Sequence, residues 1–97
     1  MLMKRMLATA ALIGLVASPA LAQEKFKFAL NWFPVGDHAA YWVAVEKGYF
    51  ADKGLEVELE NSKGSGDSIA KVDTGMADAG LADSAVVIAS RARGTTI

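Results

Sequence analysis

Side chains that could bind a small ligand follow the first regular segment of this 97-residue chain. Asn31, Trp32 and Phe33 come directly after an alternating polar and apolar run, and His38 follows shortly afterwards. An indole ring can stack on a flat ligand, while amide and imidazole groups exchange hydrogen bonds with one. Each also has a structural interpretation, because the aromatic rings could be core or lid residues and His38 could serve packing or lie at the surface.

A second candidate is the loop Gly64-Ser65-Gly66-Asp67. Free backbone amides ahead of a helix suit a carboxylate, sulfonate or phosphate group, although most such loops are only turns. The loop is not a P-loop, because no Gly-Lys-Ser/Thr sequence follows, and Ile69 stands where a dinucleotide fingerprint needs glycine. Asp67 would also repel a polyphosphate.

Asp83 and Ser84 form the third candidate, as a helix cap that could face a cleft and touch ligand. Metal binding is not expected, because His38 is the only histidine and the chain has no cysteine. No cofactor is implied either, and no paired acid and base indicate catalysis.

Three strand-and-helix units must position these residues. Alternating polar and apolar residues, together with the positions of glycine, proline and helix-capping residues, predict strands over 25–30, 55–60 and 77–82. The same signals predict helices over 38–47, about 65–74 and 84–93. Asp37 is expected to cap the first helix, Ser65 or Asp67 the second, and Gly48, Gly75 and Gly94 to end the three helices. The first helix is apolar over residues 39–45, which predicts cover on more than one side.

The order of these elements predicts an α/β fold with a parallel sheet and helices on both faces. Residues 55–60 suit an edge strand, and residues 95–97 resemble the start of a fourth strand. Ligands bind such sheets at the carboxyl ends of the strands, which is where the three candidate segments would meet.

The first 22 residues have the pattern of a secretion signal. Lys4 and Arg5 precede an apolar run over 6–16, and Ala20-Leu21-Ala22 is a cleavage motif, so we expect a mature chain over 23–97. An uncleaved membrane anchor is the alternative, but the apolar run is short for a bilayer span. The chain has 10 basic and 11 acidic residues; without the leader 8 basic residues remain, for a net charge of −3, which argues against nucleic acid as a partner.

The order of several short motifs resembles the N-terminal lobe of the substrate-binding proteins of ABC importers for nitrate, sulfonates, taurine and thiamine precursors. The first motifs are Asn31-Trp32-Phe33, His38-Ala39, Glu46-Lys47-Gly48-Tyr49-Phe50 and Gly54-Leu55-Glu56-Val57. The later ones are Gly64-Ser65-Gly66-Asp67-Ser68, Gly75-x-Ala77-Asp78-Ala79-Gly80 and Ala82-Asp83. The combined order is specific, whereas any single motif would be weak.

This resemblance implies a partial lobe of the type II periplasmic-binding-protein fold with three β-α units and strand order 2-1-3. It also implies a periplasmic protein that captures a small solute and delivers it to an ABC permease in the inner membrane. The residues that correspond to the cleft are Asn31, Trp32, Asp37, His38, Tyr41, Ser65, Asp67, Asp83 and Ser84. The surroundings of Trp32 and His38 are similar to those in the thiamine-precursor subgroup.

The length departs from this family pattern. The sequence contains three β-α units, whereas cleft closure needs two lobes, so we expect a fragment or a truncated gene product. Three alternatives remain at this point: part of an enzyme of the type that makes the thiamine pyrimidine in fungi, a truncated product without binding activity, or a stand-alone interaction module that pairs through the acidic edge strand over 55–60.

Overall fold

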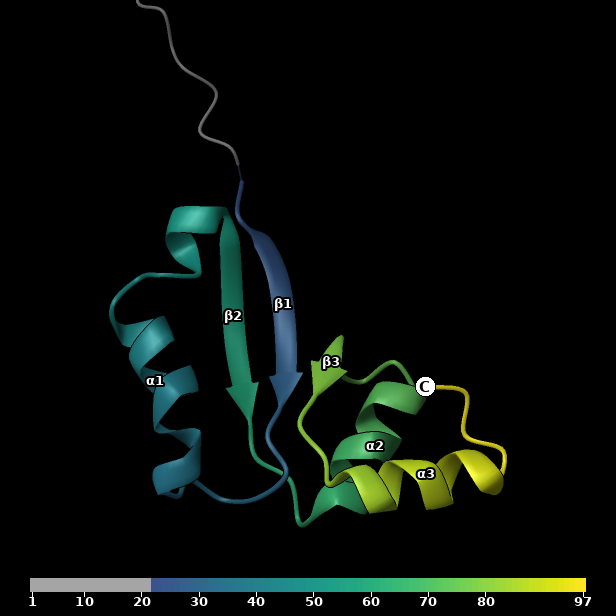
Figure 1. The fold of residues 1–97 in the computed structure, drawn as a ribbon. Coiled ribbons are helices and arrows are strands. Elements are labelled where there is room, and N and C mark those ends of the chain that lie inside the picture. The colour runs from purple at the N-terminus through teal and green to yellow at the C-terminus, as the bar shows by residue number, and fades with distance from the viewer. Residues whose placement is uncertain (1–21) are drawn as a thin grey trace, which may run out of the picture.

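The computed structural model of the protein describes residues 22–97 (Figure 1). The predicted leader over 1–22 lies outside the described residues except for Ala22. In chain order the elements are β1 (Glu24–Ala29), η1 (Gly36–His38), α1 (Ala39–Glu46), η2 (Ala51–Lys53), β2 (Leu55–Glu60), α2 (Ser65–Asp73), β3 (Ala79–Gly80) and α3 (Ser84–Ala92), where η marks a short 3-10 helix. This confirms the predicted alternation of strands and helices.

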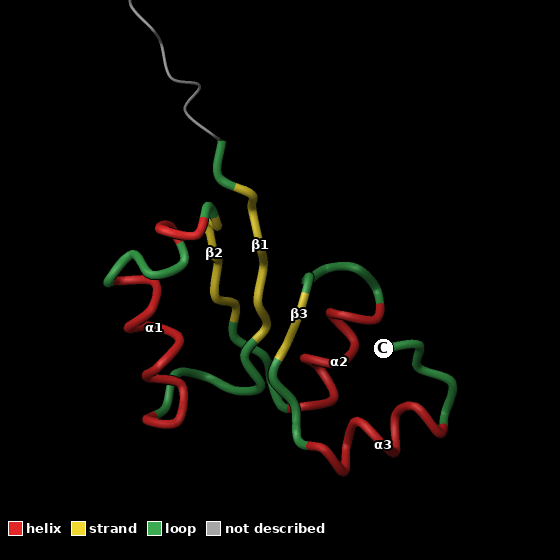
Figure 2. The backbone as a smooth tube through the Cα atoms, turned by 45° about the horizontal axis from the view of Figure 1, so that its top comes forward, coloured by secondary structure: helices red, strands yellow, loops and turns green. Residues whose placement is uncertain are grey.

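The three strands form one parallel sheet in the order β2-β1-β3, as predicted. β1 pairs with β2 over its whole length, from Glu24 opposite Leu55 to Ala29 opposite Glu60. β3 pairs with β1 only through Phe28 opposite Ala79 and Ala29 opposite Gly80. The strands therefore run in one direction, and their carboxyl ends lie at one edge of the sheet. Figure 2 shows β1 between β2 and β3.

α1 packs on one face of the sheet, and α2 packs on part of the other. Strict alternation in β1 and β2 places apolar side chains on one face, where the Tyr41 ring of α1 stacks on Phe28 with ring centroids 5.2 Å apart. α2 packs on the opposite face, because Ser68 and Val72 are the side chains nearest to Gly80 of β3. Figure 1 shows α1 beside β2, and α2 and α3 together beyond β3.

The core lies where β1 ends. Ala29 and Leu30 are fully buried there, and Ile69 and Ala77 are almost completely buried. Ser68 also belongs to this region, since its hydroxyl group donates a hydrogen bond to the Ala29 carbonyl oxygen at 3.2 Å. A buried hydroxyl group needs such a partner to offset the loss of water.

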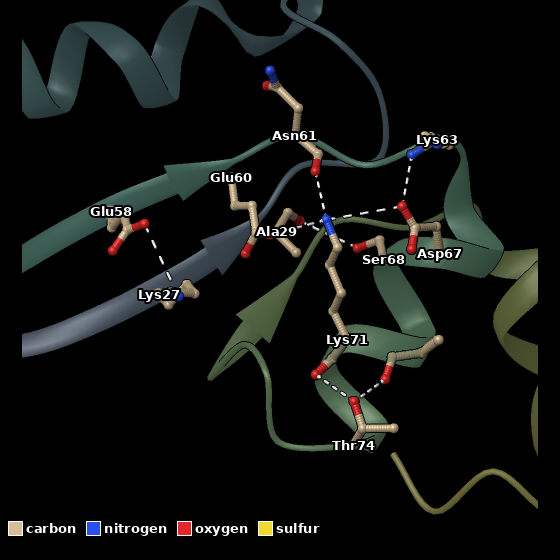
Figure 3. Close-up of polar contacts among 11 residues, drawn as sticks. Lys27, Ala29, Glu58, Glu60, Asn61, Lys63, Asp67, Ser68, Lys71 and Thr74 are labelled. Carbon is tan, nitrogen blue, oxygen red and sulfur yellow. Dashed lines mark hydrogen bonds and ion pairs between the residues drawn. The ribbon is translucent and has the colours of Figure 1, made fainter.

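Lys71 links α2 to the end of β2 (Figure 3). Its ammonium group donates to the Asn61 carbonyl oxygen at 2.6 Å and lies 3.2 Å from the Glu60 carboxylate and 3.8 Å from that of Asp67. Only 13% of the Lys71 side chain is exposed. The aliphatic stem is thus covered, while three oxygen partners satisfy the charge.

Glycines end the helices as predicted. Gly48, Gly75 and Gly94 have φ values of 73°, 78° and 104°, in the left-handed region that side chains with a Cβ atom rarely adopt. A residue in this conformation cannot continue a right-handed helix, so each helix ends there.

The third strand is shorter than the predicted range of 77–82. Before it, the Asp78 carboxylate accepts the Lys27 backbone N–H at 2.7 Å, so a side chain replaces a strand partner. After it, Leu81 still donates its N–H to the Ala29 carbonyl oxygen, and the chain then turns toward α3. Regular pairing is therefore limited to Ala79–Gly80.

Three further sequence predictions were wrong. Asp37 does not cap α1 but lies within η1, and neither Ser65 nor Asp67 caps α2, which begins after Gly64 without a side-chain cap. Residues 95–97 are not a strand, because the Thr96 backbone N–H and hydroxyl group both bond to Asp73 Oδ1, at 3.0 and 2.9 Å. This contact ties the segment to the end of α2.

The expectation of cover on several sides of α1 was also wrong for the described residues. No residue of α1 is buried, and Trp42 and Val43 are 36% and 48% exposed. Only the side that carries Tyr41 meets the sheet.

Among residues 22–97, no helix has the length and apolar character that a membrane span requires.

Candidate functional site

A cavity of about 380 Å³ lies at the carboxyl ends of β1 and β3. The loop after β1, the 3-10 helix η1 and the segment between β3 and α3 line it. Its lining residues are Asn31, Trp32, Val35, Asp37, His38, Leu81, Ala82 and Asp83. The fold therefore places a cavity where parallel α/β sheets bind ligands.

His38 and Asn31 form a hydrogen-bonded pair in this lining. Their Nε2 and Oδ1 atoms are 2.9 Å apart, and His38 is only 2% exposed. Because an amide oxygen can only accept, His38 Nε2 donates this hydrogen bond. Nδ1 is buried without a hydrogen-bond partner among the described residues.

Trp32 supplies the aromatic part of the lining. It is 48% exposed, and its ring meets Phe33 edge to face with centroids 5.7 Å apart and an angle of 82° between the planes. The contact with Phe33 restrains one part of the indole while leaving much of its surface free. A free indole face beside hydrogen-bonding groups is suited to a flat polar ligand.

Asp83 caps α3, as predicted. Its Oδ1 accepts the N–H groups of Ala85 and Val86 at 2.9 and 3.3 Å, and its own N–H donates to Ser65 Oγ at 2.9 Å. This last bond joins the starts of α2 and α3. Asp83 thus lines the cavity with one oxygen engaged in capping, while Ser65 supports it from behind without lining the cavity.

Five of the nine predicted site residues line this cavity: Asn31, Trp32, Asp37, His38 and Asp83. Tyr41 instead stacks on the sheet, and Ser84 is exposed at the start of α3. Asp67 accepts the Lys63 N–H at 2.9 Å and neighbours the Lys71 ammonium group. Its carboxylate is therefore engaged within the protein rather than directed at this cavity.

Sequence reasoning missed the apolar part of the lining, which is Val35, Leu81 and Ala82. Leu81 and Ala82 follow β3 directly, so their position at a strand's carboxyl end was a usable signal. Val35 had no comparable signal, because the irregular loop before η1 decides where its side chain lies.

A larger cavity, of about 610 Å³, lies on an open face of the sheet. Alternating charged residues of β1 and β2 line it, including the pair Lys27 and Glu58 at 4.0 Å. Paired charges on a solvated sheet face need no ligand to explain them. The cavity of about 380 Å³ at the strand ends is the better candidate, because it combines strand ends, an exposed indole and a buried imidazole.

Within residues 22–97, no group of three or more acidic, His or Cys side chains is arranged to hold a metal ion.

Together these features define a partial α/β lobe of the kind that binds small molecules at the ends of its strands. The chain belongs to the NMT1/THI5 like family, whose model matches residues 35–97. The matched segment contains most of the cavity lining, with Asn31 and Trp32 just ahead of it.

The named relatives are synthases from fungi and, from bacteria, a thiamine biosynthesis protein and a binding protein. A 4-amino-5-hydroxymethyl-2-methylpyrimidine phosphate synthase of Saccharomyces cerevisiae is 31% identical over 74 residues, which are 76% of this chain and 22% of the relative. A putative thiamine biosynthesis protein of Haemophilus influenzae is 46% identical over 41 residues, or 42% of this chain and 13% of the relative. A formylaminopyrimidine-binding protein of Halalkalibacterium halodurans is 42% identical over 43 residues, or 44% of this chain and 13% of the relative. The chain thus spans about a fifth or less of the length of these proteins.

Proposed function

We propose that this chain forms part of the first lobe of a solute-binding protein that captures an aminopyrimidine precursor of thiamine. The cavity at the strand ends carries this proposal, because an exposed indole lies beside the Asn31 and His38 pair. The name of the formylaminopyrimidine-binding relative supports a solute-binding role and this ligand class. Sulfonates and nitrate remain the other candidate solutes from the sequence resemblance.

The chemistry of the lining suits an aminopyrimidine better than a small inorganic anion. A flat heteroaromatic ring can lie against Trp32, and its polar edge can exchange hydrogen bonds with Asn31 and His38. Asp37 and Asp83 add negative charge to the lining, which disfavours an anion and favours groups that donate hydrogen bonds. Lysine and arginine side chains are absent from this lining.

Capture and delivery would require parts beyond this lobe. In a two-lobed binding protein a cleft closes on the solute, and the closed form docks on a membrane permease. We propose a periplasmic location and an ABC permease as the partner, on the basis of the leader pattern over 1–22 and the sequence resemblance.

A second candidate function is participation in pyrimidine synthesis. The match to the yeast synthase extends over 74 residues, against 43 for the formylaminopyrimidine-binding relative. The identities have the opposite order, 31% against 42%. An assay for formation of 4-amino-5-hydroxymethyl-2-methylpyrimidine phosphate by the complete natural protein separates the two functions.

The binding proposal is tested by titration of the complete natural protein with formylaminopyrimidine, 4-amino-5-hydroxymethyl-2-methylpyrimidine, taurine and nitrate. Tryptophan fluorescence is a suitable signal, because Trp32 lines the cavity. A Trp42→Phe variant keeps the Trp32 signal and removes that of the tryptophan on α1. We expect saturable binding of the pyrimidines and none of taurine or nitrate. Absence of pyrimidine binding, or tighter binding of an anion, would contradict the proposal.

A further inference from the structure

A hydrogen bond between the starts of two helices holds part of the cavity lining in place. The Asp83 N–H group donates to Ser65 Oγ at 2.9 Å. Ser65 is the first residue of α2, and Asp83 is the residue that caps α3. Asp83 lines the cavity at the strand ends, whereas Ser65 does not. A residue outside the cavity therefore contacts the backbone of a residue in its lining.

This contact fixes one end of the lining segment over 81–83. The other end is fixed to β1, because the Leu81 N–H group donates to the Ala29 carbonyl oxygen at 2.8 Å. The carboxylate and carbonyl oxygens of Asp83 accept N–H groups from the first turn of α3 itself. Those bonds shape the start of α3 but do not place it relative to the rest of the fold. The bond to Ser65 does, since it joins Asp83 to α2.

The segment that carries Ser65 is itself held by polar contacts (Figure 3). Asp67 Oδ2 accepts the Lys63 N–H group at 2.9 Å and lies 3.8 Å from the Lys71 ammonium group. Lys71 also donates to the Asn61 carbonyl oxygen at 2.6 Å. The Ser65 hydroxyl group thus belongs to a braced segment, which makes it a well-placed partner for Asp83.

The carboxylate of Asp83 is open to a ligand. Asp83 is exposed and lines the cavity. Both of its capping bonds use Oδ1, at 2.9 and 3.3 Å from the two amide nitrogens. Because Oδ1 faces the amides of α3, the second carboxylate oxygen points away from them. An ionised carboxylate can only accept hydrogen bonds, so it matches an N–H group of a ligand.

Resting on the proposed function, we infer that Ser65 is a positioning residue for the ligand. It holds Asp83 at the cavity, where the carboxylate accepts a hydrogen bond from an N–H group of the pyrimidine. Ser65 acts through Asp83 and does not touch the ligand. An acceptor that the protein has already ordered gains affinity, because binding does not have to order it. Loss of the Ser65 hydroxyl group should therefore weaken binding only as far as Asp83 contributes to it.

The test is a double-mutant cycle in the complete natural protein, with 4-amino-5-hydroxymethyl-2-methylpyrimidine as the ligand. Ser65→Ala removes the acceptor of the Asp83 N–H group. Asp83→Asn keeps that N–H group and an oxygen for the cap, since Asn caps helices about as well as Asp. It replaces the second carboxylate oxygen with an NH₂ group, which donates instead of accepting. Calorimetry gives the dissociation constant for the natural protein, both single variants and the double variant.

Two further variants are controls. Ser65→Thr keeps a hydroxyl group at the same position. Ser84→Ala removes a hydroxyl group from the neighbour of Asp83, which does not line the cavity. Both should bind the pyrimidine as the natural protein does.

We expect Asp83→Asn to weaken binding by about fivefold to tenfold, the scale of one hydrogen bond. Ser65→Ala should weaken binding by about threefold in the natural background and have almost no effect in the Asp83→Asn background. An equal loss in both backgrounds would indicate a role that does not pass through Asp83 and would overturn the inference. Unchanged affinity in either single variant would also overturn it, while leaving the proposed function intact. If the natural protein did not bind the pyrimidine, the proposed function and the inference would both fail.

Amide hydrogen exchange in the free protein tests the contact without a ligand. In Ser65→Ala the Asp83 amide should exchange faster, because it has lost its acceptor. The Leu81 amide, which is bonded to Ala29, should exchange at its natural rate. Unchanged exchange at Asp83, or an equal acceleration at both amides, would contradict a local positioning role for Ser65.

Discussion

A Cβ atom at Gly80 would lie 2.7 Å from the hydroxyl oxygen of Ser68. It would also lie 3.1 Å from Val72 Cγ2 and 3.2 Å from the Ala29 carbonyl oxygen. The Ser68 hydroxyl group cannot simply rotate away, because it would lose its hydrogen bond to Ala29 and stay buried. The absence of a side chain at Gly80 therefore allows α2 to lie close against β3.

We expect Gly80→Ala to lower the free energy of unfolding by about 1–3 kcal/mol, as overpacking of a close contact does. Gly66→Ala is a matched control, because Gly66 lies within α2, has no atom near the added carbon and needs no left-handed conformation. The control should be neutral or slightly stabilising. Urea denaturation of both variants gives the comparison, and equal stability of the two would argue against the close approach.

The order of elements was predictable because local signals agreed with the fold. Alternation in residues 55–60 predicted β2 with its bounds, and the glycine after each helix predicted its end. β3 was less predictable, since the Asp78 side chain takes a backbone partner of β1 that a longer strand would have used. The segment 95–97 was misread because its contact with Asp73 is remote in sequence.

The candidate site was predictable where it depends on strand ends, as for Asn31, Trp32 and Asp83. It was not predictable where side chains have alternative partners inside the fold. Tyr41 is engaged by Phe28, and Asp67 by the Lys63 N–H group. Such pairings depend on the distance between elements, which sequence spacing does not encode.

Trp32 is expected to contribute directly to solute binding. Trp32→Ala in the complete natural protein should weaken binding of 4-amino-5-hydroxymethyl-2-methylpyrimidine by about 1–3 kcal/mol, the scale of a lost aromatic surface. Trp42→Ala is the matched control, because Trp42 is 36% exposed on α1 and does not line the cavity. Calorimetric titration is the measurement. Equal affinities for the two variants would place Trp32 outside the site.

Asp73 gives the C-terminal segment a pH dependence. The hydrogen bonds that Thr96 donates to its carboxylate, first from the backbone N–H and then from the hydroxyl group, lower the pKa of Asp73 below 3.8. A pKa lowered in the folded state stabilises the protein above the unfolded value, and this contribution is lost as pH falls below about 3.8 through the folded value.

We therefore expect Asp73→Asn to reduce stability at pH 7 and to have a smaller effect near pH 3. A carboxyl titration followed by NMR should show the pKa of Asp73 rising toward its ordinary value in Thr96→Val, which loses the hydroxyl donor but keeps the backbone donor. Asp52 in η2 offers a control carboxylate remote from Thr96 in the sequence. A Thr96→Val titration that matched the natural protein would contradict the contact.

Export is expected to remove residues 1–22, because Ala20-Leu21-Ala22 follows an apolar run with basic residues ahead of it. Mass spectrometry of the protein from a periplasmic fraction should give Gln23 as the first residue. An Ala22→Arg variant should retain the leader, since cleavage needs a small residue there. Recovery of the natural protein with Met1 in place would sink the prediction.

Residues 23–97 produced alone are expected to be marginally stable and to bind solute weakly. Burial in so short a chain roughly cancels the entropy of ordering, on the order of 1.5 kcal/mol per residue. The packing is also incomplete: an apolar cavity of about 250 Å³ lies between the sheet and the residues Tyr41 and Phe50. In addition, Trp42, Val43 and Ile88 are exposed, with Ile88 at 70%.

Calorimetry of residues 23–97 should therefore show a broad thermal transition, and sedimentation should show association through these apolar surfaces. A sharp two-state transition of a monomer, with pyrimidine affinity equal to that of the complete natural protein, would show that this part of the lobe is self-sufficient.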